Sequence, residues 1–171
     1  MKKPRSYARL KEIASWAFII FAISFLLSLF IFKDKLNNFT SQMIIKQIDS
    51  ITLFKSSSVI ESSYNYELNG ESFKLTFLEF GAKNCSSCKR MEKVMSEISN
   101  SYPNEVNVVF LNILLQENQT MMKLFGIATI PTQVILNRAG REIFRHNGFI
   151  SAKDLSKVFL DIAGIPIPSS I

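Results

Sequence analysis

An uncharged apolar run near the N-terminus constrains this chain more than any other feature. Between Ile13 and Phe32 the sequence reads IASWAFIIFAISFLLSLFIF, and serines are the only polar residues in it. A helix of this length spans the roughly 30 Å hydrocarbon core of a bilayer. A core helix of a globular protein would normally keep a polar face. We therefore predict that residues 13–32 form one transmembrane helix.

A cleaved signal peptide is the main alternative for this run. Its apolar stretch would be about 7–15 residues long and would end at a small-residue cleavage site. The run is longer than that, and Lys33, Asp34 and Lys35 follow it without an Ala-x-Ala pattern. The sequence thus favours an anchor that is retained.

The positive charge of the chain is concentrated before the predicted span. The net charge is +6 over 171 residues, but residues 1–12 hold five Lys or Arg against one Glu. The remainder is nearly balanced, which argues against a nucleic-acid-binding protein. The excess of cations on the N-terminal side predicts a cytoplasmic tail at 1–12 and an extracytoplasmic location for residues 33–171. The expected protein is a single-pass protein of the cytoplasmic membrane.

Residues 33–63 are predicted to be a linker with some helical character. We expect this segment to pack against the following domain. A helix on the membrane surface is the alternative, although its polar face is not notably basic. The Ser56–Ser58 run is expected to break the helix. The apolar residues at helical spacing are Met43, Ile44, Ile48, Ile51 and Phe54.

Alternating strand and helix signals fill residues 64–163, and residues 164–171 are predicted to be a C-terminal tail. Two strand-like runs, Tyr64–Leu68 and Ser72–Phe80, flank Asn69-Gly70, a dipeptide typical of hairpin turns. The elements expected after them are a helix around Met91–Ile98, a central strand at Val106–Leu115, a helix at Glu117–Phe125, strands at Thr132–Leu136 and Glu142–Arg145, and a helix at Ser151–Ala163 capped by Ser151.

The two cysteines of the chain, Cys85 and Cys88, lie between a predicted strand and a predicted helix. At a helix N-terminus the free backbone N–H groups and the helix dipole favour thiolate over thiol. Cys88 follows about one turn later, so its sulfur can reach that of Cys85. This arrangement suits a two-step exchange, in which Cys85 attacks a disulfide and Cys88 resolves the mixed disulfide.

Three other interpretations of the cysteine pair are open at this point. A structural disulfide over so short a loop would remove little unfolded-state entropy. A structural zinc site normally needs four protein ligands, and the chain offers the two cysteines and His146. Two unrelated buried thiols would not explain the position between strand and helix.

No metal site is predicted from the remaining candidate ligands. His146 lies on a late strand beside Arg145 and Asn147, and we expect it to be exposed near the strand end. Met121 and Met122 are expected to be core or surface residues of a helix rather than copper ligands.

Further motifs make residues 64–163 resemble the thioredoxin family. They share with it the order of elements, CxxC at the first helix, Leu111-Asn112-Ile113 in a strand, Gly-Ile-x-x-Ile-Pro-Thr at 126–132 and Gly148 before the last helix. The resemblance implies an α/β thioredoxin-like fold, with a central mixed sheet flanked by helices. Here that fold would be preceded by the predicted transmembrane helix.

The resemblance also implies roles for five residues. Cys85 and Cys88 would form a redox-active disulfide, so no other cofactor is expected. Pro131 would be cis and lie beside the cysteines, with the Ile130 backbone pairing with an extended substrate segment. Glu79 would take the place of the buried acid that helps to move the proton of the second cysteine. On sequence alone, Glu79 could equally be exposed on the alternating face of a strand.

The sequence departs from the family pattern around the proposed site. Asn84 stands where a tryptophan commonly precedes the first cysteine, and Ser86 and Ser87 replace the usual Gly-Pro. Phe110 replaces the lysine that is often paired with the buried acid, so Glu79 lacks an obvious cation. The intervening dipeptide strongly affects redox potential in this family, and Ser-Ser leaves the direction of electron flow open.

These observations predict a membrane-anchored thiol-disulfide oxidoreductase that reduces disulfides of extracytoplasmic proteins, with a membrane protein as electron donor. Tethering favours this function, because it keeps the domain near its donor. An oxidase or isomerase is the alternative within the same chemistry. A binding or chaperone module that uses the Pro131 groove and leaves the cysteines idle is the alternative outside it.

Overall fold

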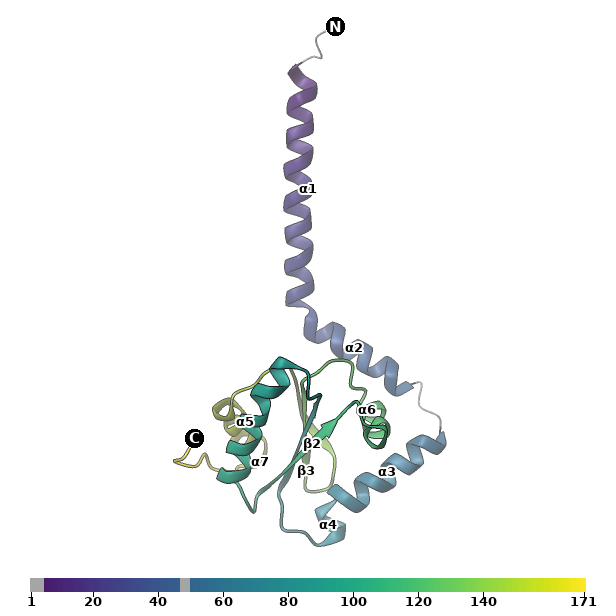
Figure 1. Ribbon diagram of the computed structural model, residues 1–171, viewed down its shortest axis with the longest axis vertical. Helices are drawn as coiled ribbons and strands as arrows, with labels where there is room; N and C mark the ends of the chain where they lie inside the picture. Colours follow the sequence, from purple (N-terminus) through teal and green to yellow (C-terminus); the bar gives the residue numbers. More distant parts are fainter. Residues whose placement is uncertain (1–4, 47–49) are drawn as a thin grey trace. The chain divides into compact units, whose positions relative to one another are not determined.

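The computed structural model describes residues 5–46 and 50–171, and within them the side chains of residues 16–33, 35–46 and 57–171. The chain divides into two compact units, residues 1–39 and residues 40–171. Residues 40–171 are called the globular unit below. The elements in chain order (Figure 1) are α1 (Arg5–Ile31), α2 (Lys33–Lys46), α3 (Ser50–Tyr64), α4 (Tyr66–Asn69), β1 (Leu75–Gly81), α5 (Ser86–Ser101), β2 (Val106–Asn112), the 3-10 helix η1 (Gln116–Asn118), α6 (Gln119–Leu124), β3 (Thr132–Asn137), β4 (Glu142–Asn147) and α7 (Ala152–Ala163).

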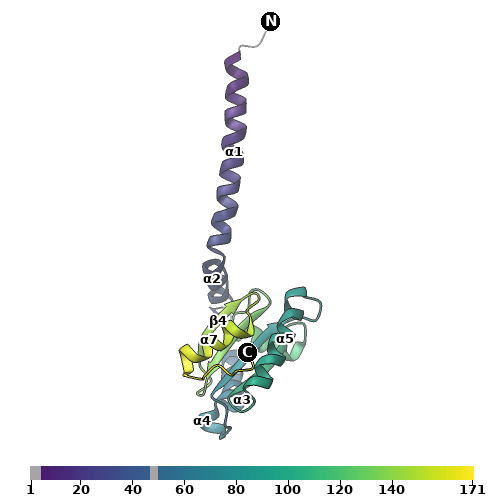
Figure 2. The same ribbon diagram turned by 90° about the vertical axis from the view of Figure 1, so that its left-hand side faces the viewer.

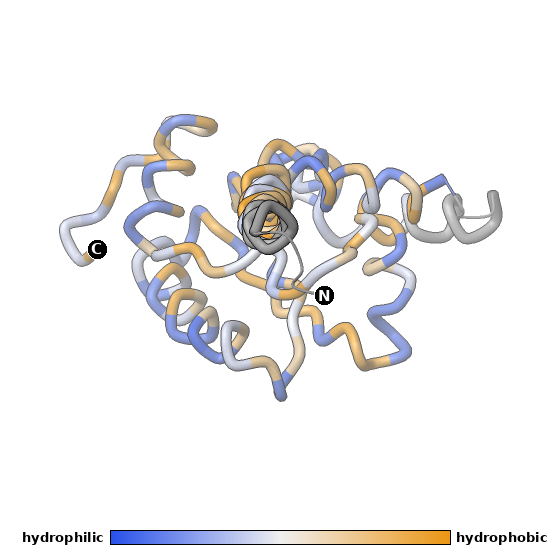
Figure 3. Tube along the Cα trace, turned by 90° about the horizontal axis from the view of Figure 1, so that it is seen from above, coloured by the Kyte–Doolittle hydropathy of each residue, from blue (hydrophilic) through white to orange (hydrophobic). Residues whose placement is uncertain are grey.

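Helix α1 includes most of the predicted span and ends at Ile31. Its described apolar side chains, such as those of Trp16, Phe18 and Phe30, are exposed, and its coloured part is mostly orange in Figure 3. Among the described residues, no single helix is both long and apolar enough to cross a membrane, whereas the pair Trp16–Ile31 and Lys35–Lys46, bent by 58°, meets the length and composition required. The membrane-spanning role of residues 13–32 stays a prediction.

The sheet of the globular unit is mixed, as the sequence predicts. Its four strands lie in the order β2-β1-β3-β4. Strands β1 and β2 are parallel and are connected through α5, whereas β1 pairs with β3, and β3 with β4, in antiparallel fashion. Strand β1 is therefore hydrogen-bonded along both edges.

Helices cover both faces of the sheet, with α5 and α7 on one face and α3 and α6 on the other (Figures 1 and 2). Successive residues of β1 point to opposite faces. Phe77 accordingly belongs to one core cluster with Met91 of α5 and Phe159 of α7. Leu78 belongs to a second cluster that includes Met121 of α6. The two cores share β1 as their common wall.

The prediction that Val106–Leu115 forms a central strand is wrong in two respects. Strand β2 ends at Asn112, where the side chain of Asn112 accepts a hydrogen bond from the Leu114 N–H and turns the chain. It also lies at the edge of the sheet rather than in the middle. An apolar run predicts that both faces of a strand are covered, and helices cover both faces of this sheet. The run does not show whether the strand has a neighbouring strand on one side or on both.

The predicted hairpin around Asn69-Gly70 is also wrong. Residues Tyr66–Asn69 form the short helix α4, and Gly70 ends it in the left-handed conformation with φ of 80°. A glycine with positive φ terminates helices as readily as it forms hairpin turns, so the dipeptide fits both structures. Tyr66 is buried, and its hydroxyl lies 2.7 Å from that of Thr76 on β1.

The segment predicted as a linker is largely helical. Helix α3 continues through Ser56–Ser58, so this run does not break it. Ile48 and the side chains of Ile51 and Phe54 lie outside the described residues. Ile60 and Tyr64 pack against the second core cluster, in agreement with the predicted packing role.

Residues 40–46 of α2 also pack closely within the globular unit. Ser41 is buried, and a Cβ added at Gly126 would lie only 2.4 Å from its carbonyl oxygen. Gly126 has φ of 56°, a conformation that glycine adopts without strain. The glycine that opens the 126–132 motif is therefore required both for its backbone conformation and for this contact.

Candidate active site

The two cysteines lie where β1 leads into α5, as the sequence predicts. Cys85 is the N-cap of α5, and its Sγ accepts a hydrogen bond from the backbone N–H of Cys88 at 3.3 Å. The Ser87 hydroxyl lies 3.2 Å from the same sulfur. A thiolate at Cys85 would thus receive hydrogen bonds and the positive end of the helix dipole, which stabilise its negative charge.

The structure shows Cys85 and Cys88 joined by a disulfide bond, with their Cα atoms 5.2 Å apart. Their surroundings differ. Cys85 is partly exposed, whereas Cys88 is only 3% exposed. A Cβ added at Gly81 would lie 3.4 Å from the Cys88 sulfur, so α5 rests directly on the end of β1. An incoming molecule can reach Cys85 more readily than Cys88.

The Ile130–Pro131 peptide bond is cis, as the family resemblance implies. The antiparallel register pairs Thr132 with Phe80 and so brings Pro131 to the end of β1 from which the CxxC segment leaves. The Gly148 N–H donates to the Pro131 carbonyl at 2.8 Å, which ties the proline to the end of β4. The loop that carries Ile130 and the cysteine segment therefore share one edge of the sheet.

Glu79 is fully buried, which excludes the alternative of an exposed strand residue. Its Oε2 accepts a hydrogen bond from Gln133 Nε2 at 2.9 Å, while Oε1 has no hydrogen-bond partner in the part of the chain that the structure describes. Burial raises the pKa of Glu79 to about 8, and the Gln133 hydrogen bond opposes this only in part. The carboxyl group is consequently protonated at neutral pH.

Gln133 is the site residue that the sequence analysis missed. The register aligns Phe110, Glu79, Gln133 and His146 across the four strands. Phe110, which replaces the lysine common in the family, is thus paired with Glu79 from β2. On the other side of Glu79, the uncharged amide of Gln133 on β3 contacts the acid. The alternation of side chains along β3 indicates which face of the sheet Gln133 occupies. Its position beside Glu79 follows only from the pairing of β1 with β3, which the sequence does not show.

The other candidate ligands are not gathered into a site. His146 is half-buried rather than exposed, near the end of β4, with Nε2 lying 3.2 Å from the Phe149 carbonyl. Met121 is in the second core cluster and Met122 packs against it, as expected for helix residues. No group of three or more His, Cys, Asp or Glu suited to a metal ion occurs among the described residues.

The thioredoxin-like domain family matches residues 65–163, which is more than half of the chain. The chain belongs to the thioredoxin family. A thioredoxin from Buchnera aphidicola subsp. Acyrthosiphon pisum is 36% identical over 94 residues, which cover 55% of this chain and 82% of the relative. A thioredoxin from Pyropia yezoensis is 29% identical over 87 residues, which cover 51% of this chain and 78% of the relative.

The fold is also similar to that of thioredoxin O2 from Arabidopsis thaliana in its oxidised state. The TM-score is 0.49 at 17% sequence identity, and the match covers 64% of this chain and 88% of that one.

Membership of the thioredoxin family, together with the close cysteine pair, identifies the chain as a thiol-disulfide oxidoreductase.

The buried carboxyl group should make the stability of the oxidised protein depend on pH. The pKa of Glu79 is raised from 4.5 to about 8, so folding takes up a proton between these pH values. The free energy of unfolding should fall as pH rises through this window, by at most about 1.4 kcal/mol per pH unit. Glu79→Gln should remove this contribution, and urea unfolding of the oxidised protein at several pH values would measure it.

Glu71→Gln, at an exposed position, is the matched control and should keep the wild-type pH dependence. If the Glu79→Gln variant kept the wild-type pH dependence, Glu79 would not be the group that takes up a proton on folding.

Proposed function

We propose that this member of the thioredoxin family is a membrane-anchored reductase of disulfides in extracytoplasmic proteins, and that Cys85 and Cys88 are its redox centre. The observation that carries the proposal is the cysteine pair at the N-terminus of α5, with one sulfur accessible and one buried. Such a pair can divide the exchange between an attacking and a resolving thiol.

The reduced form would carry out the reaction in two balanced steps. The Cys85 thiolate attacks one sulfur of the client disulfide, forms a mixed disulfide and releases the other client sulfur as a thiolate. The Cys88 thiolate then attacks the Cys85 sulfur and releases the second client thiolate, which leaves the Cys85–Cys88 disulfide seen here. Two electrons pass from the enzyme dithiol to the client, and the released thiolates take up protons from the medium or from the site.

Glu79 is proposed to handle the proton of Cys88. It lies two residues before Gly81 on the same face of β1, which is roughly 7 Å along a strand. A Cβ added at Gly81 would lie 3.4 Å from the Cys88 sulfur, so this end of β1 is close to Cys88. A carboxyl group with a pKa of about 8 can exchange protons with a thiol near neutral pH. Its distance along the strand favours transfer through a water molecule.

The cis-proline loop is proposed to hold the client chain. The Ile130 backbone has no hydrogen-bond partner among the described residues, so it is free to pair with an extended segment. A small cavity of about 90 Å³, lined by Ile113, Ile127 and residues 128–130, lies on the side of this loop. Its size suits one small apolar side chain of the client.

The membrane anchor is proposed from residues 13–32. Their uncharged apolar sequence, the helical conformation of α1 through Ile31 and the exposure of its described apolar side chains support this role. The cations of residues 1–12 support a cytoplasmic N-terminus. Anchoring would raise the effective concentration of the domain near a membrane protein that supplies electrons.

Substitution of each cysteine should have a different effect. Cys85→Ser should abolish reduction of insulin disulfides, because the attacking sulfur is lost. Cys88→Ser should retain the attack but trap mixed disulfides with client proteins, which non-reducing electrophoresis of cell extracts would detect. Ser96→Ala is the matched control at an exposed position of the same helix and should still turn over. Full activity of Cys85→Ser would remove the proposed nucleophile.

The direction of electron flow can be measured by equilibrium titration of the disulfide against glutathione. A reductase should have a potential below roughly −230 mV, close to thioredoxins, whereas a strong oxidant would lie near roughly −120 mV. A reduction potential near that of strong oxidants would contradict the proposed reductase function and would indicate that the protein donates disulfides to its clients.

Topology can be tested with a protease added to intact spheroplasts. The protease should degrade the chain beyond Lys35 and leave an N-terminal epitope attached to the membrane. Detergent lysis provides the control, since it should expose both sides. Full protection in intact spheroplasts, with a known extracytoplasmic protein degraded in the same sample, would overturn the orientation.

A further inference from the structure

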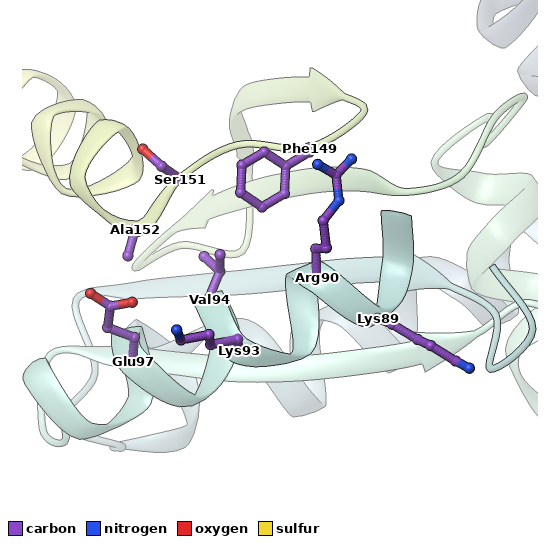
Figure 4. Close-up of a pocket in the computed structure, with 8 residues that line it drawn as sticks. All are labelled: Lys89, Arg90, Lys93, Val94, Glu97, Phe149, Ser151 and Ala152. Carbon is purple, nitrogen blue, oxygen red and sulfur yellow. The ribbon is translucent and has the colours of Figure 1, made fainter. Parts of the chain in front are cut away.

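A groove lies between helix α5 and the start of α7, outside the redox centre and the cis-proline loop. Its volume is about 520 Å³. One wall is formed by side chains of α5, and the other by Phe149, Ser151 and Ala152 (Figure 4). Val94 forms an apolar base between the walls and is only 5% exposed.

Both walls begin directly at the redox site. Lys89, on the α5 wall, is the residue after Cys88. Phe149, on the other wall, follows Gly148, whose N–H donates to the carbonyl of Pro131. A client chain that pairs with the Ile130 backbone and presents its disulfide to Cys85 would therefore have residues near this groove.

The groove carries an excess of positive charge. Lys89, Arg90 and Lys93 line it, against a single carboxylate, Glu97. None of the three cations forms an ion pair with a described side chain. Lys89 and Lys93 are four residues apart on one helix, so their like charges repel each other. Glu97 follows Lys93 by one turn and offsets part of this repulsion, but the groove lining still holds two more cations than carboxylates, which favours an anionic ligand.

Arg90 and Phe149 form the centre of the groove. The guanidinium carbon of Arg90 lies 4.7 Å from the centroid of the Phe149 ring, and Figure 4 shows the two side chains facing each other. Phe149 is nevertheless 41% exposed, which leaves part of its ring open for an apolar contact. The ring holds the guanidinium in position, and its donors remain available to a carboxylate.

The start of α7 adds little to anion binding. The Ser151 hydroxyl already donates to the Asp154 carboxylate at 2.7 Å and accepts from the Asp154 N–H. The acidic side chain in the first turn also offsets the positive end of this helix. Arg90 and Lys93 are consequently the groups best placed to bind an anion, while Lys89 extends away from Phe149 in Figure 4.

We infer that this groove binds an acidic segment of the client protein beside the disulfide to be reduced. Carboxylates of the client pair with Arg90 and Lys93, and an apolar client residue packs on Phe149. The groove would select clients whose target cysteine is flanked by Asp or Glu. This inference rests on the proposed reductase function, because it names the class of substrate for that site.

The test compares two disulfide-bonded peptides that differ only in flanking residues, Asp and Glu in one and Lys in the other. The reduced full-length protein in detergent micelles should reduce the acidic peptide with roughly fivefold higher kcat/KM at low salt, as expected for two exposed charge pairs. The preference should shrink as ionic strength rises, because salt screens exposed charges.

Charge reversal should remove the preference. In the double variant R90E/K93E the ratio of the two kcat/KM values should fall to one or below, and the neutral variant R90Q/K93Q should give an intermediate ratio. The matched control is K123E/R141E, which makes the same charge change at exposed positions outside the groove. Its ratio should equal that of the wild-type protein.

The small neutral compound bis(2-hydroxyethyl) disulfide separates the two proposals. If the wild-type protein reduces neither this compound nor the peptides, the proposed function fails. If it reduces all of them, but with equal kcat/KM for the two peptides, the reductase function stands and the groove proposal is overturned. Weaker binding of R90E/K93E to anionic lipid vesicles without any change in the peptide ratio would assign the cations to lipid headgroups and would also overturn it.

Discussion

The pairing of β1 along both edges determines most of this structure. All seven residues of the strand are buried, and its alternating side chains contribute to the cores on both faces of the sheet. The parallel pairing with β2 requires α5 to cross over the sheet, which places the cysteines at the end of β1. The antiparallel pairing with β3 brings the cis-proline to the same edge. The redox site is thus a consequence of how one strand is paired.

The surroundings of the buried acid show how the site tolerates the absence of a lysine. Phe110 is paired with Glu79 across β1 and β2, and a Cβ added at Gly81 would lie 2.9 Å from the Phe110 ring. Gln133 supplies the only polar side-chain contact to the acid among the described residues. Burial raises the pKa of Glu79 to about 8, and the hydrogen bond from the uncharged amide lowers it less than a neighbouring cation would, so the carboxyl group is mainly protonated at neutral pH.

The sequence predicted those features that depend on nearby residues or on a complete motif. The cap of α7 by Ser151 follows from a local pattern, and the positions of the cysteines and the cis-proline follow from family motifs. The edge position of β2 and the role of Gln133 depend on which strands pair, which no local pattern contains. Asn69-Gly70 does not distinguish a hairpin turn from the end of a helix, because a glycine with positive φ occurs in both. The basic groove needs the packing of α5 beside α7 and could not be seen in the sequence.

The burial of Cys88 beside the end of β1 has a kinetic consequence. Because Cys88 is only 3% exposed and packs close to the end of β1, small thiols from the medium compete for Cys85 but have little access to its partner. Once a mixed disulfide has formed at Cys85, its resolution is a reaction within one molecule, favoured by a high effective molarity. The lifetime of that covalent complex should then be set by the protein itself and be largely independent of the thiol concentration around it.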